Sequence, residues 1–185
     1  MSNIRPMKIA ALVGMPGSGK SVVANTFIKN GYQCVRFGDI TDLEVKKRGL
    51  DLNEDNEKKV REELRKQLGM AAYAILNLPR IETARAISNV IIDGLYSWEE
   101  YKYLVDKLGE ELAIVEVWAP PSVRYGRLQN RDVRPLTPAQ ARSRDFAEIE
   151  NVNKGGPIAM ANFTIMNDSS LDSLVEKTNI VIRSL

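Results

Sequence analysis

Residues 14–21 read Gly14-Met15-Pro16-Gly17-Ser18-Gly19-Lys20-Ser21 and fit the pattern G-x-x-x-x-G-K-[ST] at every fixed position. Glycines at these positions allow a tight turn in which successive backbone N–H groups point at one set of phosphate oxygens. A helix that begins near Lys20 would add the positive end of its dipole. The stretch therefore predicts a loop that binds the phosphates of a nucleotide.

The residues on either side of this loop agree with that prediction. Lys8–Val13 is a short apolar run typical of a buried parallel strand. Residues 22–28 place apolar side chains at helical spacing, and Asn30-Gly31 is a typical helix stop. The dinucleotide fingerprint G-x-G-x-x-G does not fit, because Gly19 is followed by Lys20-Ser21-Val22. Strand, loop and helix in this order favour a nucleoside triphosphate site over an accidental Gly/Ser turn.

Composition limits the class of protein. The 185 residues suit one domain, and 26 basic against 24 acidic residues leave a net charge of +2, which gives no support for a nucleic-acid or membrane-surface binder. No apolar run approaches the length of a membrane span, and residues 1–6 contain no signal-peptide core. The single cysteine, Cys34, suits a reducing, cytoplasmic setting, and we expect it to be buried in a strand.

The chain contains no histidine. That absence excludes His-based triads, His metal ligands and His general bases. Proton transfer would fall to carboxylates, lysines or bound water.

Strand and helix patterns alternate along the chain. We expect further strands at residues 33–37, 89–94, 112–118 and 163–167, and helices at 40–48, 53–68, 70–87, 97–108, 122–131 and 170–177, followed by an apolar segment at 180–182. Pro79 should kink or break its helix, and Gly155-Gly156 should form a hinge or turn. This alternation predicts an α/β fold with about five parallel strands and helices on both faces.

Two charged segments each allow two interpretations. Residues 53–68 are either a solvated helix face with i,i+4 ion pairs or a surface whose Lys and Arg residues meet a substrate. Residues 127–144 carry five arginines and are either a lid over polyphosphate or a solvated hairpin. We favour the solvated face for the first segment. We favour the lid for the second, because the phosphate loop supplies a ligand that needs this charge.

The chain resembles small P-loop kinases of the adenylate kinase and dephospho-coenzyme A kinase group, and is especially similar to a largely archaeal set of adenylate-kinase-related proteins. The resemblance covers nearly the whole chain and rests on Gly14–Ser21, Phe37-Gly38-Asp39, Ile91-Ile92-Asp93-Gly94, the Arg127/Arg131 spacing and Ala161–Leu171. It implies a three-layer P-loop fold in a single domain, 1–185. The core would span about 7–126 and 155–185, with a helical acceptor region at about 39–88 and a lid at about 127–154.

Motif and resemblance together imply ATP and Mg²⁺ as cofactors and assign roles to residues. Lys20 would reach the β- and γ-phosphates, Asp39 would orient the acceptor hydroxyl, and Arg131 would offset developing charge. The cofactor-binding candidates are Gly14, Met15, Pro16, Gly17, Ser18, Gly19, Lys20, Ser21, Val22, Arg127 and Arg131, and the Mg²⁺ candidates are Ser21 and Asp93. Asp39 is equally well explained as a helix N-cap. For Asp93 we favour the Mg²⁺ role over the alternative of an Asp-Gly turn.

The sequence departs from this family at two positions. Asp42 stands where adenylate kinases carry an arginine that grips the monophosphate, and Leu95-Tyr96-Ser97 stands where many relatives carry another. A carboxylate would repel a phosphate, so we consider Lys46, Lys47 or Arg48 as substitutes.

Two hypotheses follow. The first is a Mg-ATP-dependent phosphotransferase acting on a nucleotide or another small acceptor. The second is an ATP- or AMP-binding regulatory or assembly protein with weak ATPase activity and a protein partner or homodimer. A GTPase is disfavoured, because Asn153-Lys154-Gly155-Gly156 fails the Asn-Lys-x-Asp pattern at its last position. An AAA+ motor is disfavoured by the length of the chain.

Overall fold

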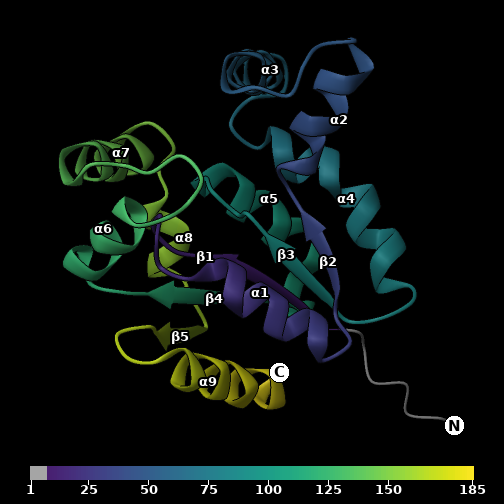
Figure 1. Cartoon of the computed structure of the whole chain (residues 1–185). Coiled ribbons are helices and arrows are strands. Elements are labelled where there is room, and N and C mark those ends of the chain that lie inside the picture. The colour runs from purple at the N-terminus through teal and green to yellow at the C-terminus, as the bar shows by residue number, and fades with distance from the viewer. Residues whose placement is uncertain (1–7) are drawn as a thin grey trace, which may run out of the picture.

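Strands and helices follow one another along the chain in the order that the sequence predicts (Figure 1). A computed structural model describes residues 8–185, and within them five parallel strands lie in the order β2-β3-β1-β4-β5. The strands are β1 (Ile9–Val13), β2 (Gln33–Arg36), β3 (Val90–Asp93), β4 (Leu112–Trp118) and β5 (Phe163–Met166). Residues 1–6, where we find no signal-peptide core, lie outside the described part. The predicted three-layer P-loop fold is confirmed.

Helices cover both faces of this sheet (Figure 1). They are α1 (Lys20–Lys29), α2 (Asp39–Lys47), α3 (Glu54–Leu68), α4 (Ala72–Arg85), α5 (Trp98–Leu108), α6 (Pro121–Gln129), α7 (Pro138–Glu150), α8 (Gly155–Ala159) and α9 (Leu171–Ser184), with a 3₁₀ turn η1 at Gly109–Glu111. No helix in the described range is long and apolar enough to span a bilayer.

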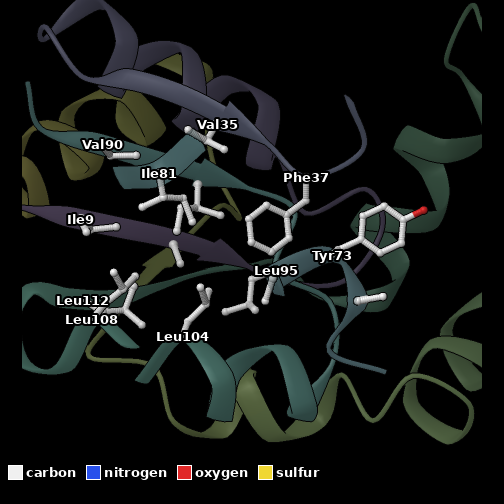
Figure 2. Packing of buried hydrophobic residues seen from close by; sticks show 14 of the residues in the cluster. Ile9, Val35, Phe37, Tyr73, Ile81, Val90, Leu95, Leu104, Leu108 and Leu112 are labelled. Atoms are coloured by element: carbon white, nitrogen blue, oxygen red, sulfur yellow. The ribbon is translucent and has the colours of Figure 1, made fainter. Parts of the chain in front are cut away.

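Strand β1 is the centre of the sheet and faces two hydrophobic clusters. Ile9, Ala11 and Val13 point into the cluster formed with α4 and α5 (Figure 2). Ala10 and Leu12 point into the opposite cluster, formed with α1 and α9. All five residues are fully buried, as the uninterrupted apolar run predicts. The carboxyl end of β1, where the phosphate loop begins, is therefore held rigidly from both sides.

Two groups of helices stand beyond the carboxyl ends of the strands. Helices α2 and α3 follow β2, and helices α6 and α7 follow β4 (Figure 1). The phosphate loop lies between these two groups of helices. The two cavities described below are also found there. In a parallel sheet this edge is where ligands bind.

Three local expectations are wrong, and a fourth is wrong in part. Helix α4 does not break at Pro79, because Asn77 and Ile81 on either side are fully buried and the packing outweighs the lost backbone hydrogen bond, while the kink stays a prediction. Helix α9 is continuous and includes the segment that we expected to be separate. Gly155-Gly156 begins α8. Cys34 is exposed, because β2 is an edge strand.

Candidate nucleotide and acceptor sites

The phosphate loop joins β1 to α1 and lines a cavity of about 720 Å³. The predicted residues that the structure brings together in its wall are Gly17, Gly19, Lys20, Ser21, Val22, Asp93, Arg127 and Arg131. Gly14, Met15, Pro16 and Ser18 complete the loop behind this wall. Two residues that the sequence did not single out, Arg36 and Leu128, also line it.

The Lys20 side chain lies inside the loop. Its Nζ donates hydrogen bonds to the carbonyl oxygens of Gly14, at 2.8 Å, and of Met15, at 3.1 Å. Burial, together with the nearby charge of Lys154, lowers the pKa of Lys20 to about 7. An anion in the cavity would favour the charged form of this amine. The loop therefore presents a preplaced amine that an anion in the cavity would hold in its charged form.

Gly14 is required by the loop's close approach to β4. Its φ of +141° is one that residues with side chains rarely adopt, and a Cβ at this position would lie 2.3 Å from the carbonyl oxygen of Val117. That oxygen belongs to the backbone of the neighbouring strand and cannot move without distorting the sheet.

We expect Gly14→Ala to lower the free energy of unfolding by about 3 kcal/mol, because backbone strain and overpacking act together. Gly31→Ala is the matched control. Gly31 also has a positive φ, +87°, but nothing lies within 4 Å of an added Cβ, so strain alone should cost about 1 kcal/mol. Urea denaturation of the two variants makes the comparison. Equal losses would contradict the clash with Val117.

Ser21 and Asp93 fit the requirements of a Mg²⁺ site. Asp93 ends β3 directly beside Leu12 of β1, and both Ser21 and Asp93 line the cavity. Burial raises the pKa of Asp93, and the charge of Lys20 opposes that rise. No cluster of three or more carboxylate or thiol ligands occurs in residues 8–185. Mg²⁺ commonly takes one or two protein oxygens and completes its shell with water and phosphate oxygens, so this donor set suits it.

Arg127 and Asn167 brace the loop from the side. Asn167, at the end of β5, donates from Nδ2 to the Ser18 carbonyl oxygen at 2.7 Å. Arg127 donates from Nη2 to Oδ1 of Asn167 at 3.1 Å, and it also lines the cavity. Asn167 belongs to the run that carries the family resemblance, but sequence reasoning assigned it no role.

Arg124 contacts the backbone of the phosphate loop, and the sequence analysis assigned it no role. Its Nη1 donates to the Pro16 carbonyl oxygen at 3.1 Å, and its Nη2 lies 2.6 Å from Oδ2 of Asp145 on α7. Both side chains are almost fully buried. An arginine on a helix is normally taken for a solvent-exposed residue, so the sequence offered no signal for this pair.

Asp39 lies outside the walls of both cavities described here. Its carboxylate pairs with Arg36, at 3.1 Å, and with Arg80, at 2.7 Å. Helix α2 begins at Asp39 with Gly38 as N-cap and no side-chain cap, so the N-cap interpretation is wrong. Asp42, which replaces the expected arginine, pairs with Arg36 at 3.1 Å. Arg36 itself faces the nucleotide cavity, so these carboxylates hold a guanidinium beside it.

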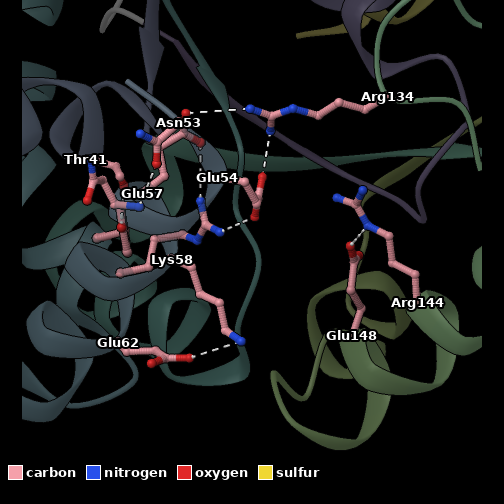
Figure 3. A network of polar contacts seen from close by, with 12 residues as sticks. Thr41, Asn53, Glu54, Glu57, Lys58, Glu62, Arg134, Arg144 and Glu148 are labelled. Carbon is pink, nitrogen blue, oxygen red and sulfur yellow. Dashed lines mark hydrogen bonds and ion pairs between the residues drawn. The ribbon is translucent and has the colours of Figure 1, made fainter. Parts of the chain in front are cut away.

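A second cavity of about 600 Å³ lies between α2, α3 and the segment that follows α6. It meets the nucleotide cavity at residues that line both, namely Arg36, Gly38, Tyr96 and Arg131. Arg134 reaches across it to α3, with Nη1 2.7 Å from Oε2 of Glu54 (Figure 3). The arginine-rich segment therefore contacts α3 beside the phosphate loop, and its role as a lid stays a prediction.

Helix α3 contributes to this cavity, so its interpretation as a solvated face is wrong in part. Arg61 and Arg65 line the cavity, whereas Lys58 and Glu62 form an exposed pair on another face of the helix (Figure 3). Lys46, Lys47 and Arg48 are absent from the described lining of the cavity, and Arg48 pairs with Glu44 and Glu63 instead. The arginines of this site come from α3, from residues 131–144 and, at Arg36, from β2.

A buried ionic cluster lies at the second cavity, whose wall includes Tyr96, Glu148 and Lys154. Lys154 is 1% exposed, pairs with Glu148, and places Nζ 4.7 Å from the centre of the Tyr96 ring. Glu100 is fully buried, and its Oε2 accepts hydrogen bonds from the backbone N–H groups of Tyr96 and Ser97 in the predicted capping box. Burial raises the pKa of Glu100 to about 7.

The raised pKa of Glu100 predicts a pH dependence of stability. The folded protein keeps a proton that the unfolded chain, with a carboxyl pKa near 4.5, releases. The stabilisation is fully present below pH 4.5 and is lost as the pH rises through 7. Glu100→Gln keeps an acceptor for both N–H groups and cannot ionise. Between pH 5 and 8 we expect the free energy of unfolding of the wild type to fall by about 3 kcal/mol relative to this variant.

Urea denaturation at pH 5, 6, 7 and 8 measures this difference. Glu110→Gln, an exposed residue just beyond α5, is the control and should track the wild type at every pH. Parallel curves for the wild type and Glu100→Gln would show that Glu100 does not titrate in this range.

Comparison with known proteins agrees with this architecture. A protein-family model described as an AAA domain matches residues 11–149. The expectation that the chain is no AAA+ motor rests on its length and stays a prediction. Shikimate kinase from Bacteroides thetaiotaomicron has a similar structure, with a TM-score of 0.62 and 15% identity over 96% of this chain and 99% of that one. Dephospho-CoA kinase from Campylobacter jejuni superposes with a TM-score of 0.53 and 14% identity over 96% and 97%.

These structural similarities show a P-loop kinase-like fold, while the relationship to adenylate kinases in particular stays a prediction. The sequence comparison is more specific. A UPF0200 protein from Thermococcus gammatolerans is 36% identical over 181 residues, which cover 96% of this chain and 95% of that protein. With this identity over almost its whole length, the chain belongs to the UPF0200 family of P-loop proteins.

Proposed function

We propose that this protein transfers the γ-phosphate of Mg-ATP to a small acceptor bound in the second cavity. The observation that carries the proposal is that the nucleotide cavity and the second cavity share a boundary formed by Arg36, Gly38, Tyr96 and Arg131. A phosphotransferase needs such a junction between donor and acceptor, whereas a nucleotide-binding switch needs only the first cavity. The structurally similar shikimate and dephospho-CoA kinases are named for transfers of this kind.

The reaction would depend mainly on positioning and charge. The acceptor oxygen forms a bond to the γ-phosphorus as the bond to the β,γ-bridging oxygen breaks, and the acceptor proton leaves to water. Bound Mg²⁺ would neutralise charge on the β- and γ-phosphates, with Ser21 and Asp93 as its protein ligands. Lys20 and the loop amides bind the phosphates, and Arg131 stabilises charge at the junction. The proposed lid contacts α3 through the exposed ion pair between Arg134 and Glu54.

Asp39 takes a different role from the one that the resemblance implies. Its carboxylate is occupied by Arg36 and Arg80, and it lines neither cavity. We therefore assign it to positioning Arg36 at the junction, where this guanidinium faces the transferred phosphate.

A second candidate is a nucleotide-responsive regulatory protein with slow ATP hydrolysis. It is favoured by the same pairing of Asp39, because the residue expected to orient an acceptor hydroxyl is unavailable. In this case a protein partner or a second copy of the chain would bind differently to the protein when the lid closes over ATP.

The test is ADP release from Mg-ATP across a panel of acceptors. The panel contains nucleoside monophosphates, nucleosides, dephospho-coenzyme A, small hydroxy acids and no acceptor, with Lys20→Ala as the inactive control. A rate increase of a hundredfold or more with one acceptor, about 2.7 kcal/mol of barrier, would support the kinase. A uniformly slow rate across the panel would favour the regulatory protein.

A further inference from the structure

Arg65, near the end of α3, is unlike the other arginines of the second cavity. Its Nε is buried and has no hydrogen-bond partner, and the side chain forms no ion pair within residues 8–185. The terminal N–H groups of Arg65 likewise have no hydrogen-bond partner among the described residues, so a guanidinium without a carboxylate partner stands in the cavity wall, where a ligand or water can accept from these groups. Arg65 lines the second cavity but not the nucleotide cavity.

The remaining arginines of this wall pair with carboxylates, with one exception. Arg61 pairs with Glu54 at 2.7 Å, Arg134 with Glu54 at 2.7 Å, and Arg144 with Glu148 at 3.1 Å. The exception is Arg131, which donates to the Arg134 carbonyl oxygen and faces both cavities. Among the described arginines of this wall, two therefore lack a carboxylate partner. Arg131 is at the junction, and Arg65 is away from it.

The guanidinium of Arg65 is fixed without being neutralised. Its central carbon lies 5.7 Å from the centre of the Tyr73 ring, a cation–π contact that leaves N–H groups available. The Tyr73 hydroxyl is in turn hydrogen-bonded to Thr41 Oγ1 at 2.5 Å, in the interior. The ring that supports Arg65 is thus held in place by α2. A planar guanidinium held in this way is suited to bidentate binding of a carboxylate or phosphate.

We propose that Arg65 is the anion-binding residue of the acceptor site, and that the acceptor carries a phosphate or carboxylate separate from the hydroxyl that is phosphorylated. This inference rests on the proposed function. The anionic group of the acceptor binds Arg65, and the hydroxyl that is phosphorylated then points to the junction between Arg36 and Arg131. A nucleoside monophosphate phosphorylated on its own phosphate would leave Arg65 without this partner. The acceptor class is therefore a hydroxylated small anion.

The first test is binding, which does not require turnover. The protein is saturated with Mg-ADP to occupy the phosphate loop and titrated with inorganic phosphate, and separately with acetate, while the arginine Nε–H signals are followed by NMR. We expect the Arg65 signal, identified by its loss in Arg65→Met, to shift and saturate. Arg65→Met should weaken phosphate binding at least tenfold. Lys66→Met, on the exposed neighbour, should change it less than twofold.

The second test compares matched acceptors in the ADP-release assay. The pairs are glycerol 3-phosphate and glycerol, gluconate and glucose, and a nucleoside 3′-phosphate and its nucleoside. We expect an anionic member to be preferred at least tenfold, with Arg65→Met raising its KM at least tenfold and Arg65→Lys giving partial rescue. The preferred pair distinguishes phosphate from carboxylate.

The two proposals fail separately. If the Arg65 signal shifts and saturates with anion but no acceptor raises the rate of ADP release, the anion site is supported and the proposed kinase activity is rejected. A neutral acceptor with full activity and an unchanged KM in Arg65→Met would support the kinase and overturn the anion site. A signal that does not respond to either anion would also overturn it. Thermal melting of Arg65→Met and Arg65→Lys checks that both variants are folded.

Discussion

We expect Lys20→Ala to lower the rate of ADP formation with the best acceptor by about 10³-fold or more, because under the proposed function it removes the amine that would stabilise the transferred phosphate. In the present structure the Lys20 Nζ is held by the carbonyl oxygens of Gly14 and Met15, within the loop. Exchanging these neutral acceptors for phosphate oxygens strengthens its interactions in the transition state. Steady-state kinetics with a coupled assay for ADP measures the loss.

The control for this prediction is Lys29→Ala, at the exposed end of the same helix, which should keep the wild-type rate. Calorimetric titration with Mg-ATP separates binding from turnover, since uniform loss of affinity would raise KM and leave kcat unchanged. A Lys20→Ala enzyme that retained more than a tenth of the rate would show that the phosphate loop is not the site of transfer.

We expect Asp145→Asn to lower the free energy of unfolding by about 3–5 kcal/mol, because it leaves the Arg124 guanidinium buried without its counterion. The Arg124 side chain is 5% exposed and that of Asp145 is 10% exposed, so water cannot replace the lost charge. Arg124 also donates to the Pro16 carbonyl oxygen. The variant should therefore weaken Mg-ADP binding as well as stability. Urea denaturation and calorimetric titration measure the two effects.

A double-mutant cycle tests the origin of this loss. In Arg124→Met/Asp145→Leu both charges are absent, and we expect most of the stability to return, since paired removal of a buried ion pair is often neutral. Glu150→Gln, an exposed residue at the end of α7, should change stability by less than about 0.5 kcal/mol. A double variant as unstable as Asp145→Asn would show that packing, and not the unpaired charge, causes the loss.

Local sequence patterns predicted most of the fold and the nucleotide half of the site. The apolar run of β1, the glycines of the loop and the capping box at Ser97 are short-range signals, and each appears in the structure where the spacing placed it. Because the carboxyl ends of parallel strands meet at one edge, the order of elements also brought Asp93 to the wall that contains Lys20.

The amino-acid sequence by itself determined the succession of strands and helices along the chain, the phosphate loop and its flanking residues, whereas the order of the strands in the sheet came from the tertiary structure. Only the tertiary structure decided which charges are paired. Arg124 forms an ion pair with Asp145, and Asp39 forms one with Arg80. Asn167 donates a hydrogen bond to the phosphate loop at Ser18. Each of these partners is distant in the sequence. Helix α3 carries charge on several faces, so its spacing could not reveal that Arg65 faces a cavity. An electrostatic partner is set by distance in space, and local periodicity contains no information about that distance.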